Sequence, residues 1–96
     1  MRKLILATSY YDLTRIPSTM AAKLISMQLG IQLEVVDEEW LLRKGFKPYL
    51  PSFALELSDG ETLLLRVGGL LNYLELVRRL TEEIRKLNLS KELEEF

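Results

Sequence analysis

The sequence predicts a single α/β domain, spanning residues 1–96, with a four-stranded mixed sheet. Three local patterns support this fold class. Residues 3–8 form a continuous apolar run, which is typical of a central strand covered on both faces. Residues 70–87 place apolar side chains at steps of three and four, as an amphipathic helix does. Between them, Asp59-Gly60 separates two apolar runs and predicts a β-hairpin.

The first half of the chain predicts a parallel strand–helix–strand unit. Residues 18–29 have a helical composition, begin after Pro17 and end at Gly30, a residue type that commonly terminates helices. Apolar residues then alternate over 31–37, which predicts a strand with one protected face. Two strands joined by a helix of this length form a right-handed crossover and lie parallel.

The second half predicts an antiparallel hairpin followed by a helix. Strands are expected over 53–57 and 62–67, and Gly68-Gly69 ends the hairpin. The long connection over 38–50 is expected to contain a short helical turn near Trp40. The predicted order is therefore strand, helix, strand, strand, strand, helix, with the strands arranged 2-1-3-4 in space and the helices on the faces of the sheet.

The predicted last helix carries an apolar stripe that would face the sheet. Its members are Leu70, Leu74, Val77, Leu80, Ile84 and Leu87. Glu75 with Arg79, and Glu82 with Lys86, have the spacing of favourable ion pairs on a helix. After this helix, Ser90 is expected to cap a short acidic turn.

The composition excludes several kinds of chemistry. The 96 residues include no cysteine and no histidine, so thiolate nucleophiles, Cys/His zinc sites, iron–sulfur ligation and Ser-His-Asp triads are excluded. The net charge is −1 and the basic residues are scattered, which does not favour nucleic-acid binding. No apolar stretch reaches the roughly 20 residues that span a bilayer. We expect a cytoplasmic protein without cofactor or metal, and the scarcity of Asn and Gln is typical of a heat-adapted source.

The segment before the first predicted helix concentrates groups that can bind a partner. Two rings, a cation and two hydroxyls stand within ten residues: Tyr10, Tyr11, Arg15, Ser18 and Thr19. Together they predict a groove for an extended peptide or a carboxylate at the end of the central strand. The alternative is that the two hydroxyls only cap the helix and the tyrosines are half-buried.

The first predicted helix is unusually apolar, because Lys23 is its one ionic side chain. Either it is deeply packed, or its outer face meets a partner such as a second copy of the chain. Residues 37–39 are acidic, and a solvated edge is the simpler interpretation than a cation site, which needs several converging oxygens. The aromatic residues of the long connection, namely Trp40, Phe46 and Tyr49, are expected to anchor it to the core.

The element order resembles the thioredoxin fold in its glutaredoxin-like form, and three motifs sharpen the resemblance. Ile16-Pro17-Ser18-Thr19, counted back from Leu29-Gly30-Ile31, stands at the place of the Cys-Pro-Tyr-Cys motif of that family. Leu50-Pro51-Ser52-Phe53 stands at the place of its cis-proline, and Gly68-Gly69 at the place of its glycine pair. The N-terminal domain of glutathione S-transferases is similar too, with Tyr73-Leu74 present and a preceding Glu-Ser pair absent.

The resemblance implies a scaffold without redox activity, because both cysteines of the motif are replaced and hydroxyl groups form no redox couple. It implies a binding surface that includes Ile16, Leu50, Pro51, Gly68 and Gly69. The expected function is a protein- or peptide-binding module or an assembly subunit, and not a thiol-disulfide oxidoreductase. The alternative is a protein that binds glutathione or another thiol ligand through the hydroxyl of Ser18, Thr19 or Tyr10. Leu70 and Leu71 replace the polar residues that hold a glutathione carboxylate.

Overall fold

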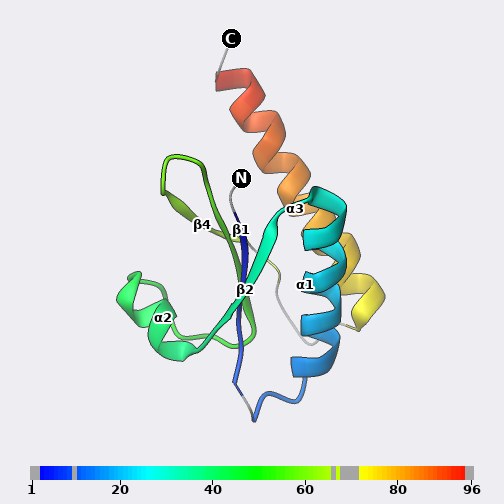
Figure 1. Cartoon of the computed structure of the whole chain (residues 1–96), viewed down its shortest axis with the longest axis vertical. Helices are drawn as coiled ribbons and strands as arrows, with labels where there is room; N and C mark the ends of the chain where they lie inside the picture. Colours follow the sequence, from blue (N-terminus) through cyan, green and yellow to red (C-terminus); the bar gives the residue numbers. More distant parts are fainter. Residues whose placement is uncertain (1–2, 10, 66, 68–71, 95–96) are drawn as a thin grey trace.

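Helices and strands alternate through most of the chain in the computed structural model, which describes residues 3–9, 11–65, 67 and 72–94 (Figure 1). In order, the elements are β1 (Lys3–Ala7), α1 (Arg15–Leu29), β2 (Gln32–Val36), α2 (Glu38–Arg43), β3 (Ser52–Glu56), β4 (Thr62–Leu65) and α3 (Tyr73–Glu94). The short helical turn expected near Trp40 is the helix α2, an element that the predicted order did not include.

The four strands form one mixed sheet in the order β2-β1-β3-β4, as predicted. β1 pairs with β2 in parallel and with β3 antiparallel, and β3 pairs with β4 antiparallel. Ala7 lies opposite Ser52, so the carboxyl end of β1 and the start of β3 lie side by side at one end of the strands. At the opposite end of the strands the chain turns from β3 into β4, and Gly60 in this turn adopts a φ of 89° that other residues rarely reach.

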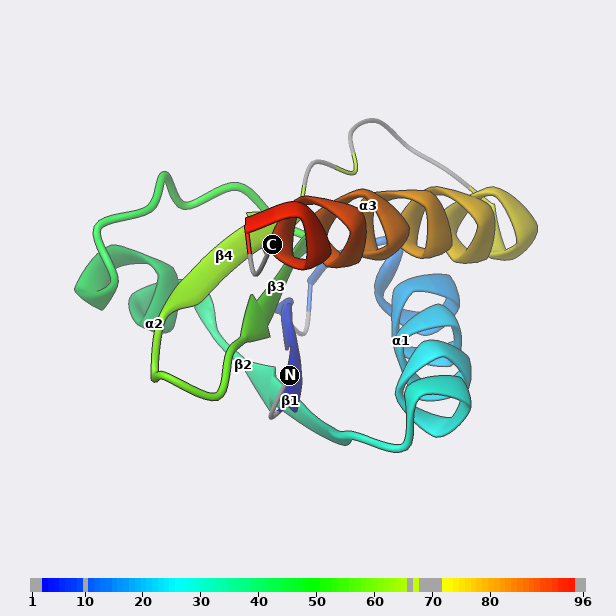
Figure 2. The ribbon, with the colours of Figure 1, turned by 90° about the horizontal axis from the view of Figure 1, so that it is seen from above.

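One face of the sheet holds the main core. Leu4 and Leu6 of β1 are fully buried against α1 and α3, and Phe53 and Leu55 of β3 join the same cluster. Figure 2 shows α1 and α3 together on this side of the sheet and α2 on the opposite side. The continuous apolar run predicted a strand covered on both faces, and β1 is such a strand.

The opposite face of the sheet is apolar at one end and charged at the other. Ile5 and Ala54 lie opposite each other and are buried on this face, and Leu41 of α2 is also buried. Toward the start of β1, Lys3 forms ion pairs with Glu34 at 2.6 Å and Glu56 at 3.6 Å. The ammonium group therefore bridges the strands on both sides of β1. Its hydrogen bond to Glu34 is the main reason why the pKa of Lys3 is raised above 10.5.

The helix α1 begins at Arg15, three residues before the predicted start, because a proline fits in a first turn. The missing N–H of Pro17 costs nothing there, since first-turn amides have no partner inside the helix. At the other end, Gly30 has a φ of 67°, and the amides of Gly30 and Ile31 donate to the carbonyls of Met27 and Ser26. This pattern is a Schellman motif and confirms the predicted end of the helix.

The helix α3 extends beyond the predicted range at its carboxyl end. Asn72 caps it, because its side-chain oxygen accepts a hydrogen bond from the amide of Glu75 at 2.9 Å. The helix then continues to Glu94, so the expected separate turn capped by Ser90 is wrong. Among the helices of the described residues, none is long and apolar enough to cross a bilayer.

The buried stripe of α3 agrees with the prediction at Leu80 and Ile84, with Val77 and Leu87 partly buried against the core, and differs at its first turn. Leu76, Leu80 and Ile84 are buried, whereas Leu74 is 74% exposed. The predicted ion pairs also differ, since Arg78 pairs with Glu82 and Lys86 with Glu83. Steps of three and four allow two neighbouring stripes on this leucine-rich helix, and contact with α1 and β4 selects one of them. Leu70 lies outside the described residues.

Candidate functional site

The loop between β1 and α1 is organised by the carboxylate of Asp12. One oxygen accepts hydrogen bonds from the amide and the hydroxyl of Thr14, at 2.9 and 2.8 Å, and the other accepts from the hydroxyl of Thr8 at 2.9 Å. The backbone of Asp12 adds bonds to Ser9 and Arg15. Because these bonds link the end of β1 to the start of α1, the loop has a defined shape.

Hydrogen bonding also determines the acidity of Asp12. Partial burial raises the pKa of this carboxyl, but the three hydrogen bonds donated by Thr14 and Thr8 together outweigh that effect, and the pKa lies below 3.8. Asp12 is therefore ionised at neutral pH.

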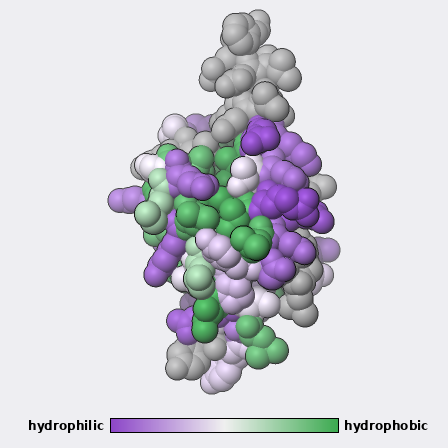
Figure 3. All heavy atoms as spheres, turned by 90° about the vertical axis from the view of Figure 1, so that its right-hand side faces the viewer, coloured by the Kyte–Doolittle hydropathy of each residue, from purple (hydrophilic) through white to green (hydrophobic). Residues whose placement is uncertain are grey.

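Four large apolar side chains stand on this loop and on the start of α1, and they point into solvent. Tyr11 is 91% exposed, Leu13 98%, Ile16 73% and Met20 52%. We call these four residues the loop–α1 patch. Figure 3 looks onto the side of the molecule that carries α1 and α3, where hydrophobic atoms gather in the middle of the face and again toward its lower end. The alternative that Tyr11 is half-buried is wrong.

A shallow hollow of about 310 Å³ lies against this patch. It is lined by Arg15, Ile16, Thr19, Met20 and Lys23, all from the first turns of α1. Apolar and cationic side chains therefore meet at one surface. The unusual composition of α1 is explained by this arrangement, because Ala21, Ala22 and Ile25 pack inward while Met20 and Met27 remain outside. Deep packing of the whole helix is excluded.

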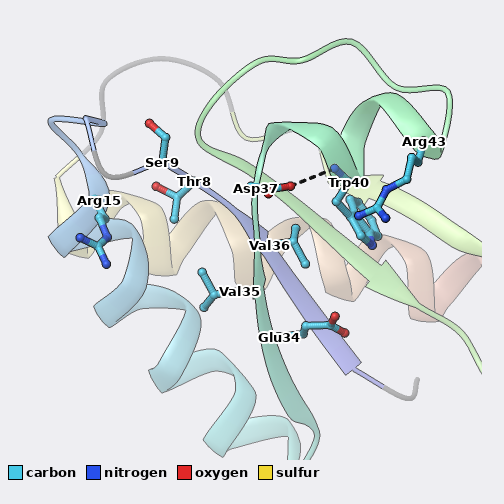
Figure 4. Close-up of a pocket in the computed structure, with 9 residues that line it drawn as sticks. All are labelled: Thr8, Ser9, Arg15, Glu34, Val35, Val36, Asp37, Trp40 and Arg43. Atoms are coloured by element: carbon cyan, nitrogen blue, oxygen red, sulfur yellow. Dashed lines mark hydrogen bonds between the residues drawn. The ribbon is translucent and has the colours of Figure 1, made fainter.

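A second, larger hollow of about 420 Å³ lies at the carboxyl ends of β1 and β2 (Figure 4). We call it the β1–β2 hollow. The residues that line it come from β2 and from the segments that follow β1 and β2, namely Thr8, Ser9, Arg15, Glu34, Val35, Val36, Asp37, Trp40 and Arg43. In Figure 4, Arg15 lies on one side of this hollow and Arg43 on the other, with the strand β2 between them.

The short helix α2 forms one wall of the β1–β2 hollow. Asp37 caps it by accepting a hydrogen bond from the amide of Trp40 at 3.2 Å, and Glu38 and Glu39 occupy its first turn. This is the favourable arrangement of charge at a helix start, so the acidic residues have a structural explanation. In the described residues, no group of acidic side chains is arranged to hold a metal ion.

The aromatic residues of the long connection behave in two ways. Trp40 and Phe46 are half-buried with ring centroids 6.3 Å apart, and the ammonium of Lys44 lies 5.8 Å from the Trp40 ring. These two rings anchor the connection, as expected. Tyr49 does not, because it is 70% exposed.

Two of the predicted hydroxyl donors, Ser18 and Thr19, are buried or already donate a hydrogen bond within α1. Ser18 is fully buried in α1 and its hydroxyl has no hydrogen-bond partner, while the hydroxyl of Thr19 donates to the carbonyl of Arg15 at 2.7 Å. Neither residue caps the helix, since α1 starts at Arg15 and Thr14 precedes it without a side-chain cap. The capping role expected for Ser18 and Thr19 is therefore wrong, and the burial of Ser18 does not favour the binding role predicted for it.

The remaining predicted site residues lie in different places. Leu50 and Pro51 are partly buried just before β3, and the peptide bond between them is cis. Neither belongs to the residues that line the two hollows. Arg15 lines both, and Ile16 lines the smaller one. Tyr10, Gly68 and Gly69 lie outside the described residues.

Sequence reasoning missed the organising role of Asp12 and the exposed position of Val35. An aspartate two residues before a threonine, just ahead of a helix, is a recognisable turn signal that identifies Asp12. Val35 was assigned to a protected face, yet it is 52% exposed, because β2 is an edge strand and α1 does not cover its carboxyl end. Only the tertiary arrangement contains that information.

Comparisons of the chain with protein-family models, with curated proteins and with solved structures each returned no match.

Proposed function

We propose that the chain is a binding module without redox activity, which recognises a protein or an extended peptide through the loop–α1 patch. The observation that carries this proposal is the exposure of Tyr11, Leu13, Ile16 and Met20 within ten consecutive residues. Contiguous exposed apolar surface of this kind marks interaction sites in water-soluble domains.

The hydrogen bonds of Asp12 support the proposal, because they order the patch before any partner binds. A surface that is already ordered loses less conformational entropy on binding, and affinity rises accordingly. Arg15 and Lys23 border the apolar residues and supply the polar rim that protein interfaces usually have. Leu50 and Pro51 come just before Ser52, which pairs with Ala7 at the end of β1, so they are candidates to extend the proposed surface.

We also propose that the domain is thioredoxin-like. The strand order 2-1-3-4, the parallel pairing of β1 with β2 and the antiparallel pairing of β3 and β4 support this assignment. The alternative function, a thiol-ligand site that uses the hydroxyl of Ser18 or Thr19, has less support, because Ser18 is buried and the hydroxyl of Thr19 is engaged.

Site-specific photo-crosslinking in extracts of the native source tests the binding surface. A photoreactive residue in place of Leu13 should form a discrete adduct with the partner, and the added substitution Ile16→Asp should abolish it. The control is the same residue in place of Leu42, which is 55% exposed on α2, across the sheet. Adducts of equal yield from both positions, or none from position 13, would contradict the proposal.

The mass of the adduct identifies the kind of partner. Met27 is 78% exposed and continues the apolar surface along α1, so a second copy of this chain is one candidate. The chain has a mass of 11.1 kDa, and an adduct of twice that mass would indicate a homodimer through the first helix. Any other discrete mass would indicate a different protein.

A further inference from the structure

The β1–β2 hollow lies where the chain leaves two neighbouring parallel strands toward opposite faces of the sheet. After β1 the chain enters α1 on the main core side, and after β2 it enters α2 on the other side (Figure 2). The two connections therefore separate and leave a crevice outside the carboxyl ends of the strands. In open α/β sheets this is the position at which small ligands characteristically bind. The hollow, at about 420 Å³, is within the size range of small-molecule sites.

The two carboxylates that line the hollow already have partners. Glu34 accepts a hydrogen bond from the ammonium of Lys3 at 2.6 Å, and Asp37 accepts one from the amide of Trp40. By contrast, the guanidinium of Arg43 forms no ion pair with any acidic side chain of the described residues. The neighbouring Glu38 and Glu39 do not line the hollow. An added anion would find a donor at Arg43 without displacing an existing contact.

Arg15 stands on the opposite side of the hollow at a position that does not stabilise the helix. It is the first residue of α1, whose first turn contains no acidic residue, so the guanidinium lies at the positive end of the helix dipole. Positive charge at this end opposes helix formation and favours a bound anion instead. Departures from local rules of this kind are expected at functional positions.

We propose that the β1–β2 hollow binds a small molecule with two anionic groups, one held by Arg15 and the other by Arg43. Val35 and Val36 of β2 lie between the two arginines, so the spacer that joins the anionic groups crosses this strand (Figure 4). Guanidinium groups bind carboxylates and phosphates alike through paired N–H donors, so both dicarboxylates and bisphosphates belong to this class.

The fluorescence of Trp40 reports on binding, because it is the one tryptophan of the chain and it lines the hollow. The full chain is titrated with dicarboxylates of increasing length, from succinate to suberate, and with a hexose 1,6-bisphosphate. Hexanoate serves as the monoanionic control. A saturable change with at least one dianion, at a concentration where hexanoate has little effect, supports the proposal, and the better probe identifies the anionic group.

Variants assign the two anion contacts. Arg15→Met and Arg43→Met should each weaken binding of the dianion about tenfold, toward the level of hexanoate, as expected for the loss of one charge-assisted contact. Arg79→Met is the matched control, because Arg79 is an exposed arginine on α3 and its loss changes the net charge equally. Three results would overturn the proposal: no saturable change with any dianion, equal affinity for hexanoate, or equal weakening by Arg79→Met.

The proposal does not rest on the proposed protein-binding function, although Arg15 borders both sites, and residues that belong to one site alone separate the two. Leu13→Ser, which adds no charge beside Arg15, should leave dianion binding unchanged, and Arg43→Met should leave crosslinking at position 13 unchanged. Failure of one function can therefore be distinguished from failure of the other.

Discussion

At the scale of single residues, three polar side chains define the region around α1. The carboxylate of Asp12 accepts the hydrogen bonds that order the loop, and one of them comes from the hydroxyl of the buried Thr8. Ser18 is also buried, but its hydroxyl has no hydrogen-bond partner. Buried polar groups are stabilising when they are paired and costly when they are not. The same type of group therefore has opposite effects at Thr8 and Ser18.

Asp12→Ala should destabilise the domain by about 1–3 kcal/mol at neutral pH, because it removes three hydrogen bonds and leaves the buried hydroxyl of Thr8 unpaired. Asp59→Ala is the control, since Asp59 accepts a single hydrogen bond at an exposed turn. Denaturant unfolding measures both changes. Equal losses from the two variants would show that Asp12 does not organise the loop.

The effect of Asp12→Ala should depend on pH. The folded pKa of Asp12 lies below 3.8, so its stabilisation is fully present above that value and is lost as the pH falls through the folded pKa. The difference in unfolding free energy between the wild type and Asp12→Ala should therefore shrink in acid. A difference that grows as the pH falls would contradict this assignment.

Ser18→Ala should leave the stability unchanged or raise it, because it removes a buried hydroxyl that has no partner. Ser26→Ala is the matched control on the same helix, since Ser26 is also buried but donates to the carbonyl of Lys23 at 2.9 Å. Both substitutions gain the same helix propensity. Unfolding free energies should rank Ser18→Ala above Ser26→Ala by about 1 kcal/mol, and the reverse order would contradict the structure.

At the scale of elements, the two long helices differ in the size of the side chains that they bury. The buried face of α1 combines small residues such as Ala21 and Ala22 with Ile25, while α3 contributes Leu76, Leu80 and Ile84 to the core. The periodicity of α3 was visible in the sequence, but the choice between Leu74 and Leu76 was not. That choice depends on which side of the helix meets the sheet.

Leu80→Ala should destabilise the domain by about 2–5 kcal/mol, because Leu80 is fully buried in the main core. Leu74→Ala, on the same helix, should change the unfolding free energy by less than about 0.5 kcal/mol, since Leu74 is 74% exposed. Thermal or denaturant unfolding distinguishes the two. A large loss of unfolding free energy in Leu74→Ala would contradict the structure and support the predicted stripe, in which Leu74 faces the core.

At the scale of the whole molecule, the sheet order determines which amides are protected from solvent. β1 and β3 are central strands with neighbours on both sides, whereas β2 and β4 each have one free edge. Amide hydrogen exchange should therefore be slowest in β1 and β3 and faster in β2 and β4. Slowest exchange in β2 would contradict the order 2-1-3-4.

The arrangement of the whole molecule also brings the functional candidates together. Arg15 follows β1 and Arg43 follows β2, and 28 positions in the sequence numbering separate them. They line one hollow because the two strands are parallel neighbours, so their carboxyl ends lie side by side. The sequence marked Arg15 as a candidate, but nothing local connected it to Arg43.

The amino-acid sequence by itself determined the α/β class, the order of the strands and the absence of thiol and imidazole chemistry. These properties follow from local periodicity, from turn residues such as Gly30 and Gly60, and from composition. Only the tertiary structure decided that Ser18 is buried, that Val35 and Ile16 are exposed and that Arg43 lies across from Arg15. The physical reason is that periodicity assigns a residue to a face of its own element, whereas exposure depends on which distant element covers that face.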